Sequence, residues 1–383
     1  MKQFKIFGIT MMLVLGMGFV SCSGDDEEIV EEKVDTGIPD DSLASPNPDI
    51  DESTTSIPNI QYSVESINNI PVVRIDLTGV QNQETLEWMK LYGTGSVQQN
   101  IWVEVDEKPK GITVYNNSDN EENKAIKADL VFLVDNSGSM SEEANTIARD
   151  IISWSEKLAT SGLDIRFGCV GYDGEITGAI NITTVDVLSN YLNRYSGTSR
   201  TTGFDGDDAN SLASASSSYL CSTSQRECGA AALRFADEQF TFRSGANRIY
   251  VNFTDEPNQP NYIERFSVEN FKDQQNWNTV QGTVHTVYSD TYTSFTERTL
   301  YNEYPWKLSE YTGGTIIYTS SSFSGVSLES LPVTGAMENS YILKFGNIDG
   351  LLDGETHNVK ITIQSLDKKV KAEREFNVVF GSK

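Results

Sequence analysis

Short runs of alternating hydrophobic and polar residues occupy both ends of the chain beyond its first 56 residues. Such alternation is typical of β-strands that bury one face. The runs lie at 60–64, 72–77, 86–91, 101–105 and 112–115, and again at 341–345, 359–363 and 375–380. Neither group alone supplies enough strands for a domain, so we expect one all-β sandwich built from 57–126 and 336–383. Two small separate β modules are the alternative.

Residues 127–335 follow a different pattern, in which apolar strand-like runs alternate with runs of helical periodicity. The strand-like runs lie at 130–134, 164–172, 248–254, 282–288 and 312–318, and the helical runs at 147–154, 187–192 and 230–236. This alternation predicts an α/β fold with a doubly wound, mostly parallel sheet that is covered by helices. The predicted architecture is therefore an α/β domain inserted in an all-β sandwich domain.

Oxygen-bearing side chains follow two of the predicted buried strands. The first strand stops at Asp135, and Ser137 and Ser139 follow it in a D-x-S-x-S pattern, while Asp255 follows the strand at 248–254. Ligands of open α/β sheets collect at the carboxyl ends of the strands, so both aspartates can point into one crevice. Carboxylate and hydroxyl oxygens suit a hard cation such as Mg²⁺. The alternative is that these residues only cap a helix or a turn.

The strand that leads to Asp135, Ser137 and Ser139 resembles the start of the metal-ion-dependent adhesion site of the von Willebrand factor A (vWA) domain. Asp255 stands where that family has the aspartate of T-D-G, but Glu256 replaces the glycine. The resemblance implies a Rossmann-like fold in which the two serines bind the cation directly and the two aspartates bind mostly through water. One coordination position then remains for a ligand carboxylate. The proposed insertion is similar to that of the integrin β subunit, whose A-type domain lies within a β-sandwich.

The third part of such a site has two candidate positions. The family places a Thr, or in integrin β chains a Glu, just before the helix that precedes the Asp255 strand. Glu227 stands in this position relative to the helix predicted at 230–236, and we favour it. Thr202 and Asp205 lie in an earlier loop that forms the alternative metal or ligand loop, whereas Asp205 taken alone reads as part of a solvated turn.

Acidic residues outnumber basic ones by 55 to 29, which gives a net charge of −26. This balance excludes nucleic acid as a partner, because no basic field is present to neutralise phosphates. Two of the acidic residues, Glu142 and Glu143, fall where integrin β chains bind an adjacent second cation. We prefer the simpler reading, in which both are carboxylates that favour a helix N-terminus.

The first 56 residues have the composition of a targeting segment and a tether. Residues 1–21 read as a lipoprotein signal peptide, with a basic start and a short apolar run before the lipidated Cys22. The acidic run that follows resembles the surface-export signal of Bacteroidetes-type lipoproteins. Residues 22–56 lack aromatic residues and predict a disordered acidic tether. We therefore expect a surface-exposed outer-membrane lipoprotein that touches the membrane only through its lipid; a freely secreted protein is the alternative.

The remaining cysteines and the histidines limit the chemistry of the chain. Cys221 and Cys228 are close in sequence and could form a disulfide outside the cytoplasm, or remain two thiols, while Cys169 reads as a buried thiol. Only two histidines are present in the whole sequence. Zinc sites and histidine-based catalytic triads are therefore poorly supported.

These patterns favour a non-enzymatic binding module on the cell surface. It would hold Mg²⁺, or Mn²⁺ or Ca²⁺ in its place, and bind a protein ligand that offers an Asp or Glu carboxylate. A structural subunit of a surface assembly is the alternative function. A metal-dependent hydrolase is a third class, but no general base stands apart from the expected metal carboxylates.

Overall fold

The computed structural model describes residues 35–57, 59–116, 126–141, 143–161, 163–221, 226–289, 295–320, 323 and 326–381. Its compact unit is Thr36–Lys383. The predicted signal peptide, Cys22, the first part of the predicted tether and Glu142 lie outside the described residues.

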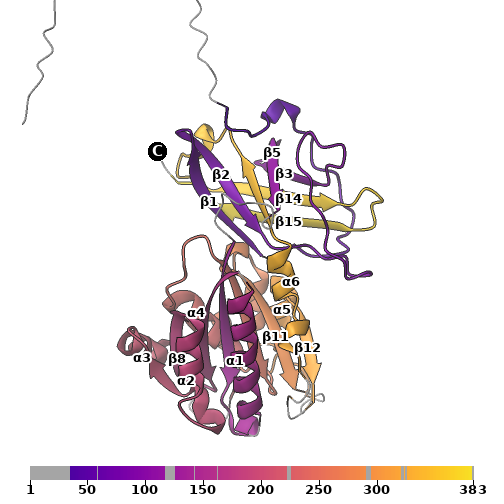
Figure 1. Ribbon diagram of the computed structural model, residues 1–383. Helices are drawn as coiled ribbons and strands as arrows, with labels where there is room; N and C mark the ends of the chain where they lie inside the picture. The colour runs from indigo at the N-terminus through magenta and orange to yellow at the C-terminus, as the bar shows by residue number, and fades with distance from the viewer. Residues whose placement is uncertain are drawn as a thin grey trace, which may run out of the picture. The chain divides into compact units, whose positions relative to one another are not determined.

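A seven-stranded sheet forms the middle of the chain (Figure 1). Its order is β12-β11-β10-β6-β7-β8-β9, and neighbouring strands are parallel except for β7 and β8. The strands are β6 (Lys127–Asp135), β7 (Asp164–Tyr172), β8 (Ile176–Thr183), β9 (Gly203–Asp205), β10 (Asn247–Thr254), β11 (Thr283–Ser289) and β12 (Ile316–Thr319). The mostly parallel sheet expected for this region is confirmed. Because β6 and β10 are parallel neighbours, their carboxyl ends meet at one edge.

Helices pack on both faces of this sheet, because successive residues of a strand point to opposite sides. In β6, Phe132 contacts Trp154 of α1 in one hydrophobic core, whereas Leu133 belongs to a second core with Phe235 of α4. The helices are α1 (Ala144–Thr160), α2 (Val185–Leu192), α3 (Ala209–Ser216), α4 (Gly229–Gln239), α5 (Lys307–Thr312) and α6 (Val333–Glu338). Near-continuous apolar strands such as β6 are the expected consequence of burial on both faces.

Two four-stranded antiparallel sheets use the remaining strands (Figure 1). One sheet has the order β1-β2-β13-β5, and the other has the order β15-β14-β3-β4. Their strands are β1 (Ile60–Ile67), β2 (Ile70–Leu77), β3 (Ile101–Val105), β4 (Lys108–Pro109), β5 (Ile112–Asn116), β13 (Tyr341–Phe345), β14 (His357–Gln364) and β15 (Lys371–Val378). The two sheets share one hydrophobic core, to which β2, β3, β13 and β14 all contribute. Each sheet therefore contains strands from before and after the central α/β region.

The strand predicted at 86–91 is not formed. Leu86 has a positive φ of 59°, and an isolated bridge between Gln81 and Trp88 replaces a ladder. Trp88 instead packs against Gly79 and Gly335, where an added Cβ would lie 2.9 Å and 2.5 Å from atoms of its ring. The apolar positions of this segment thus serve a loop that covers the start of α6, not a strand face.

The second half of the predicted tether is ordered against the antiparallel sheets, which corrects the prediction of disorder to residue 56. Asp41 accepts hydrogen bonds from Lys110 Nζ at 2.6 Å and from the Gly111 amide at 3.0 Å. The amide of Asn47 donates to Glu104 Oε1 at 2.9 Å. Composition failed as a guide because these contacts are polar and anchor the segment without aromatic residues or a core of its own.

His357 links the ends of two strands through both nitrogens of its ring. Nδ1 lies 2.8 Å from Asp106 Oδ2, and Nε2 lies 3.1 Å from Asp353 Oδ1. Burial lowers the pKa of His357, but its hydrogen bonds to the two carboxylates outweigh this and raise it above the ordinary value. Both nitrogens can donate only when the ring carries its proton.

This geometry predicts a pH dependence of stability. Because the folded pKa of His357 is raised, its contribution is present below the unfolded pKa, about 6.5, and is lost as the pH rises through the folded value. His357→Gln should flatten the free energy of unfolding between these two pKa values, measured by urea titration over that range. An unchanged pH profile in the variant would contradict the assignment.

Candidate metal centre

Asp135 is the last residue of β6 and is only 1% exposed. Its Oδ1 accepts a hydrogen bond from the Ser137 amide at 2.8 Å, and its Oδ2 accepts one from Thr254 Oγ1 of β10 at 2.8 Å. Burial, and after it the negative charge of Glu227, raises the pKa of Asp135 to about 8. A buried carboxylate in this position is stabilised by a cation and disfavoured without one.

The D-x-S-x-S loop carries its two hydroxyls toward the neighbouring strand. Ser137 Oγ lies 2.9 Å from Ser139 Oγ, and Ser139 Oγ donates to Asp255 Oδ1 at 3.1 Å. Together with the bonds of Asp135, these contacts form one hydrogen-bonded chain across the carboxyl ends of β6 and β10. The structure therefore brings together Asp135, Ser137, Ser139 and Asp255, the four residues that the sequence pattern selects.

Glu227 lies beside this chain, just before α4. Its amide donates to Gln259 Oε1 at 3.1 Å, and its carbonyl accepts from the Gln259 amide at 2.7 Å, which ties it to the loop after Asp255. Burial, followed by the charges of Glu256 and Asp255, raises the pKa of the Glu227 carboxyl to about 7. This electrostatic coupling supports Glu227 as the third candidate ligand.

The alternative loop uses its polar groups elsewhere. Thr202 is exposed, and its hydroxyl donates to the Thr198 carbonyl at 3.3 Å. Asp205 pairs with Arg194 at 3.3 Å. The residue of this loop that reaches the site is Thr201, which is buried and donates from Oγ1 to Asn136 Oδ1. The sequence pattern offered its neighbour Thr202 as the alternative to Glu227, because periodicity does not define which side chain of a 3₁₀ turn such as Gly197–Thr201 points inward.

Glu256 is a second residue that sequence reasoning passed over as a ligand. Burial, followed by the charges of Asp255 and Asp135, raises the pKa of its carboxyl to about 7. The signal was present in the sequence, because Glu256 stands where the family pattern has glycine. Burial is the largest cause of the raised pKa values of Asp135, Glu227, Asp255 and Glu256, and the main influences on these values include no Lys or Arg.

The donor set fits a hard divalent cation. Its described members are carboxylate and hydroxyl oxygens, which are the ligands that Mg²⁺ prefers, and they include no sulfur or imidazole. Within the described ranges, no group of three or more His, Cys, Asp and Glu side chains is arranged to hold a metal ion. The candidate site therefore depends on the hydroxyls of Ser137 and Ser139 in addition to its carboxylates. Glu227 and Glu256 add negative charge near them.

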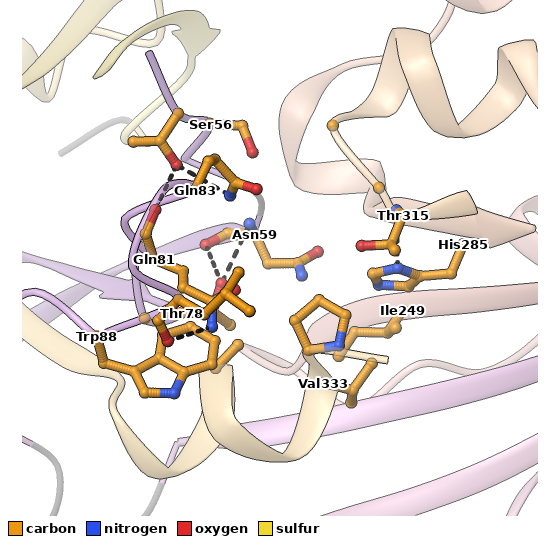
Figure 2. Close-up of a pocket in the computed structure, with 17 residues that line it drawn as sticks. Ser56, Asn59, Thr78, Gln81, Gln83, Trp88, Ile249, His285, Thr315 and Val333 are labelled. Atoms are coloured by element: carbon orange, nitrogen blue, oxygen red, sulfur yellow. Dashed lines mark hydrogen bonds between the residues drawn. The ribbon is translucent and has the colours of Figure 1, made fainter. Parts of the chain in front are cut away.

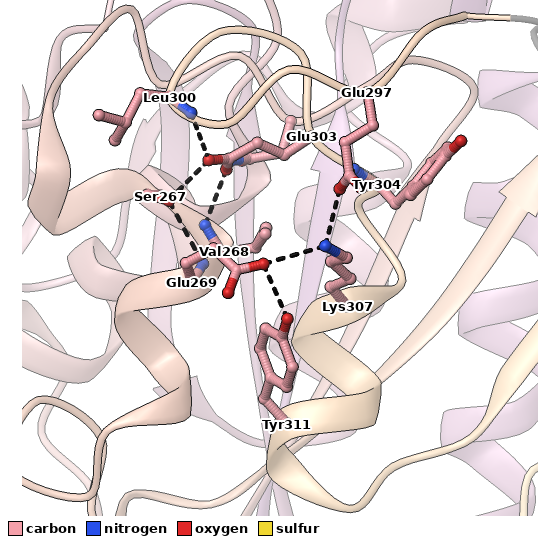
Figure 3. Close-up of polar contacts among 10 residues, drawn as sticks. Ser267, Val268, Glu269, Glu297, Leu300, Glu303, Tyr304, Lys307 and Tyr311 are labelled. Atoms are coloured by element: carbon pink, nitrogen blue, oxygen red, sulfur yellow. Dashed lines mark hydrogen bonds and ion pairs between the residues drawn. The ribbon is translucent and has the colours of Figure 1, made fainter.

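A second polar cluster surrounds Glu303 (Figure 3). Glu303 is fully buried, and its Oε2 accepts from Asn258 Nδ2 at 2.9 Å. Asn258 Oδ1 in turn accepts from the Ala230 amide at 3.0 Å, in the first turn of α4. The side chain of Asn258, oriented by Glu303, thereby connects the loop after Asp255 to the first turn of α4.

The last predicted residues lie near the site or outside the described chain. Glu143 is buried directly before α1, whereas its partner in the proposed second cation site, Glu142, is not described. Cys221 and Cys228 are buried free thiols, and the side chain of Cys228 is hydrogen-bonded to that of Cys221. The predicted disulfide is not formed in the structure, although the two thiols are neighbours. Their pairing under oxidising conditions stays a prediction.

Comparison with known proteins gives only distant likenesses. No family model and no curated protein matches the chain. The conserved hypothetical protein BatB from Bacteroides thetaiotaomicron is 14% identical, with a TM-score of 0.32 over 50% of this chain and 90% of BatB. An aerotolerance-related membrane protein from Bacteroides fragilis, carrying multiple mutations to serines, is 14% identical, with a TM-score of 0.33 over 55% of this chain and 98% of that protein. The pilus adhesin SpaC from Lactobacillus rhamnosus GG, in its open conformation, is 12% identical, with a TM-score of 0.25 over 52% of this chain and 19% of the adhesin. Likenesses at this level assign neither a family nor a function.

Proposed function

We propose that the chain is a non-enzymatic binding module of the vWA type, which holds a divalent cation and through it binds a protein ligand that offers a carboxylate. The observation that carries the proposal is the hydrogen-bonded chain of Asp135, Ser137, Ser139 and Asp255 at the edge where β6 and β10 end. Mg²⁺ is the first candidate, with Mn²⁺ or Ca²⁺ as replacements, because the donors are hard oxygens.

The role of the ligand carboxylate follows from coordination chemistry. Mg²⁺ takes six oxygens in near-octahedral geometry and keeps water wherever the protein supplies none. Two serine hydroxyls and the surrounding carboxylates leave room for water in that shell. An incoming Asp or Glu replaces a water and adds charge attraction to the cation, so the same group gives both affinity and specificity.

The raised pKa values of Glu227 and Glu256 do not require a catalytic role. A carboxyl with a pKa near 7 has the property of a general base, which would favour a hydrolase. Burial and mutual repulsion account for the raised pKa values, however, and the positive charge of a bound divalent cation opposes both by stabilising the charged carboxylates. We therefore propose binding in preference to hydrolysis.

Anchoring of the module to the outer membrane forms part of the proposal. Among the described residues, no helix is long and apolar enough to cross a bilayer. We propose that Cys22, which follows the predicted signal peptide, carries the lipid that holds the chain at the cell surface. Labelling cells with a radioactive fatty acid should mark the wild-type chain and leave Cys22→Ser unmarked.

Peptide selection tests the proposed ligand chemistry directly. Peptides from a random display library that bind the chain in Mg²⁺ and are released by EDTA should share an Asp or Glu. Replacing that residue by Asn or Gln should weaken the peptide about tenfold or more, since the amide cannot bring charge to the cation. Calorimetry on both synthetic peptides measures the difference. Equal affinity of acid and amide, or binding that persists in EDTA, would exclude this function.

A further inference from the structure

A cavity of about 350 Å³ lies at the other end of the central sheet from the candidate metal centre (Figure 2). Its lining includes Ile249 and His285 near the starts of β10 and β11, and Thr315 just before β12. Asp255 stands directly after the far end of β10. The opposite wall comes from Asn59 and from the loop that carries Trp88. The cavity and the metal centre therefore share a sheet but no residue.

The lining of this cavity is polar without being charged. None of the described residues that line it is an Asp, Glu, Lys or Arg, although the chain as a whole has a net charge of −26. Its polar groups are hydroxyls, amides and one imidazole. A charged ligand would lose its hydration without meeting an opposite charge, which is costly. The cavity therefore selects uncharged molecules that form hydrogen bonds.

Asn59 supplies an acceptor that lacks a partner in the described structure. The residue is 4% exposed, and its Oδ1 has no hydrogen bond there. Its backbone is fixed, because its carbonyl accepts from the Thr78 amide at 3.2 Å and its amide donates to Thr78 Oγ1 at 3.3 Å. Figure 2 shows the side chain directed across the cavity toward Thr315 and His285. A buried amide oxygen without a donor destabilises the free protein, so a ligand hydroxyl or amide that donates to it recovers that loss on binding.

His285 supplies the complementary donor. Burial lowers its pKa to about 4, so the ring is neutral. Its Nδ1 accepts a hydrogen bond from the Thr315 amide at 3.0 Å, which places the proton on Nε2. The turn before Thr315 is fixed, since a Cβ on Gly314 would lie 1.8 Å from the Val284 carbonyl oxygen. The hydrogen bond from the Thr315 amide and the close packing of Gly314 therefore fix the orientation of the imidazole.

Apolar groups complete the lining. Ile249, Val333 and the indole of Trp88 contribute carbon surface, and Trp88 is held in place by its contacts with Gly79 and Gly335. A ligand that suits this mixture carries hydroxyls that both donate and accept, together with a face of C–H groups. A volume of about 350 Å³ lies within the usual range for small-molecule sites.

We propose that this cavity is a binding site for a neutral carbohydrate of one or two sugar rings, distinct from the metal centre. One hydroxyl donates to Asn59 Oδ1, another accepts from His285 Nε2, and the C–H face of a ring packs against Trp88. The site does not depend on the cation, because the residues that form it lie at the opposite end of the sheet from Asp135 and Asp255.

Saturation-transfer NMR on the full chain tests the proposal with a panel of neutral sugars: glucose, galactose, N-acetylglucosamine, maltose and lactose. At least one should bind at millimolar concentration, equally in Mg²⁺ and in EDTA, and should raise the melting temperature by mass action. Asn59→Leu should weaken that sugar about tenfold or more while the melting temperature without sugar stays equal or rises, since the variant removes an unsatisfied buried oxygen. If Asn59 had a purely structural role, its replacement would instead lower the melting temperature without sugar.

Asn210→Leu, on the exposed surface of α3, is the matched control and should bind the sugar as the wild type does. If Asn59→Leu folds poorly, Ala336→Leu fills the same cavity from α6 and should also abolish binding. Absence of binding by every sugar of the panel overturns the proposal. So does undiminished binding in a folded Asn59→Leu or Ala336→Leu variant, or binding that is lost in EDTA.

Discussion

Asp135→Asn is expected to abolish stabilisation of the chain by Mg²⁺ and Mn²⁺ while leaving its melting temperature in EDTA unchanged or higher. Burial and the charge of Glu227 raise the pKa of Asp135 to about 8, so without a cation the charged form is unfavourable and the neutral amide relieves it. The wild type should gain about 2.7 kcal/mol at a cation concentration 100 times Kd, which corresponds to several degrees of melting temperature. Scanning calorimetry in each cation and in EDTA measures both quantities.

Asp205→Asn is the matched control for this experiment. Asp205 belongs to the alternative loop and pairs with Arg194, so its variant should keep the full response to the cation. Asp255→Asn should behave like Asp135→Asn, because its carboxylate accepts from Ser139 in the same hydrogen-bonded chain. A wild type whose melting temperature is the same in millimolar Mg²⁺, Mn²⁺ and EDTA would contradict the metal centre. A response lost in Asp205→Asn but kept in Asp135→Asn would move it to the other loop.

Both aspartates of the candidate site could be predicted from sequence because they end apolar runs typical of buried parallel strands. In such a sheet the strand ends share one edge, so a carboxylate at each end is brought into one crevice without knowledge of the loops. The same reasoning located β6 and β10 themselves. Periodicity works here because burial on two faces leaves a strong and continuous apolar signal.

The loops around the site could not be predicted to the residue. Thr201, not Thr202, reaches the Asp135 loop, because a 3₁₀ turn sets which side chain points inward and periodicity does not describe it. The alternating pattern around Trp88 likewise belongs to a loop, since alternation alone does not establish that a neighbouring strand is present to pair with the segment. The ordering of residues 36–56 depends on partners more than 50 residues away, such as Lys110 and Glu104, which local composition cannot reveal.

The sequence also gives no sign that Glu303 holds Asn258 in the loop after Asp255, next to the candidate metal centre. Both carboxylate oxygens are used twice, with four donors at 2.6–2.9 Å that converge from separate loops. These donors are Ser267 Oγ, Leu300 N, Val268 N and Asn258 Nδ2. A surface-like Glu in a loop gives no signal of this role, because the burial arises only when the loops assemble around it.

Glu303→Gln is therefore expected to lower the free energy of unfolding by roughly 3 kcal/mol or more, and to weaken the response to Mg²⁺ as well. The amide replaces one acceptor oxygen by an NH₂ group that faces two of the four donors. An NH₂ group in place of Oε2 leaves the Val268 amide and Asn258 Nδ2 without an acceptor, and one in place of Oε1 leaves the Leu300 amide without one. With the NH₂ group in place of Oε2, the side chain of Asn258 loses the contact with Glu303 that orients it between the loop after Asp255 and the first turn of α4. Urea unfolding in EDTA measures the first effect, and the Mg²⁺-induced shift in melting temperature measures the second.

Glu297→Gln, in the same cluster, provides the contrast (Figure 3). Glu297 pairs with Lys307 at 2.9 Å, but its side chain is 28% exposed and can exchange this partner for water. Its loss should cost about 1 kcal/mol or less and leave the cation response intact. Equal effects of the two substitutions would mean that the loop after Asp255 is held by its general packing. A large effect of Glu303→Gln alone would mean that one buried carboxylate, far from Asp255 in sequence, fixes the geometry in which Asp255 meets Ser139.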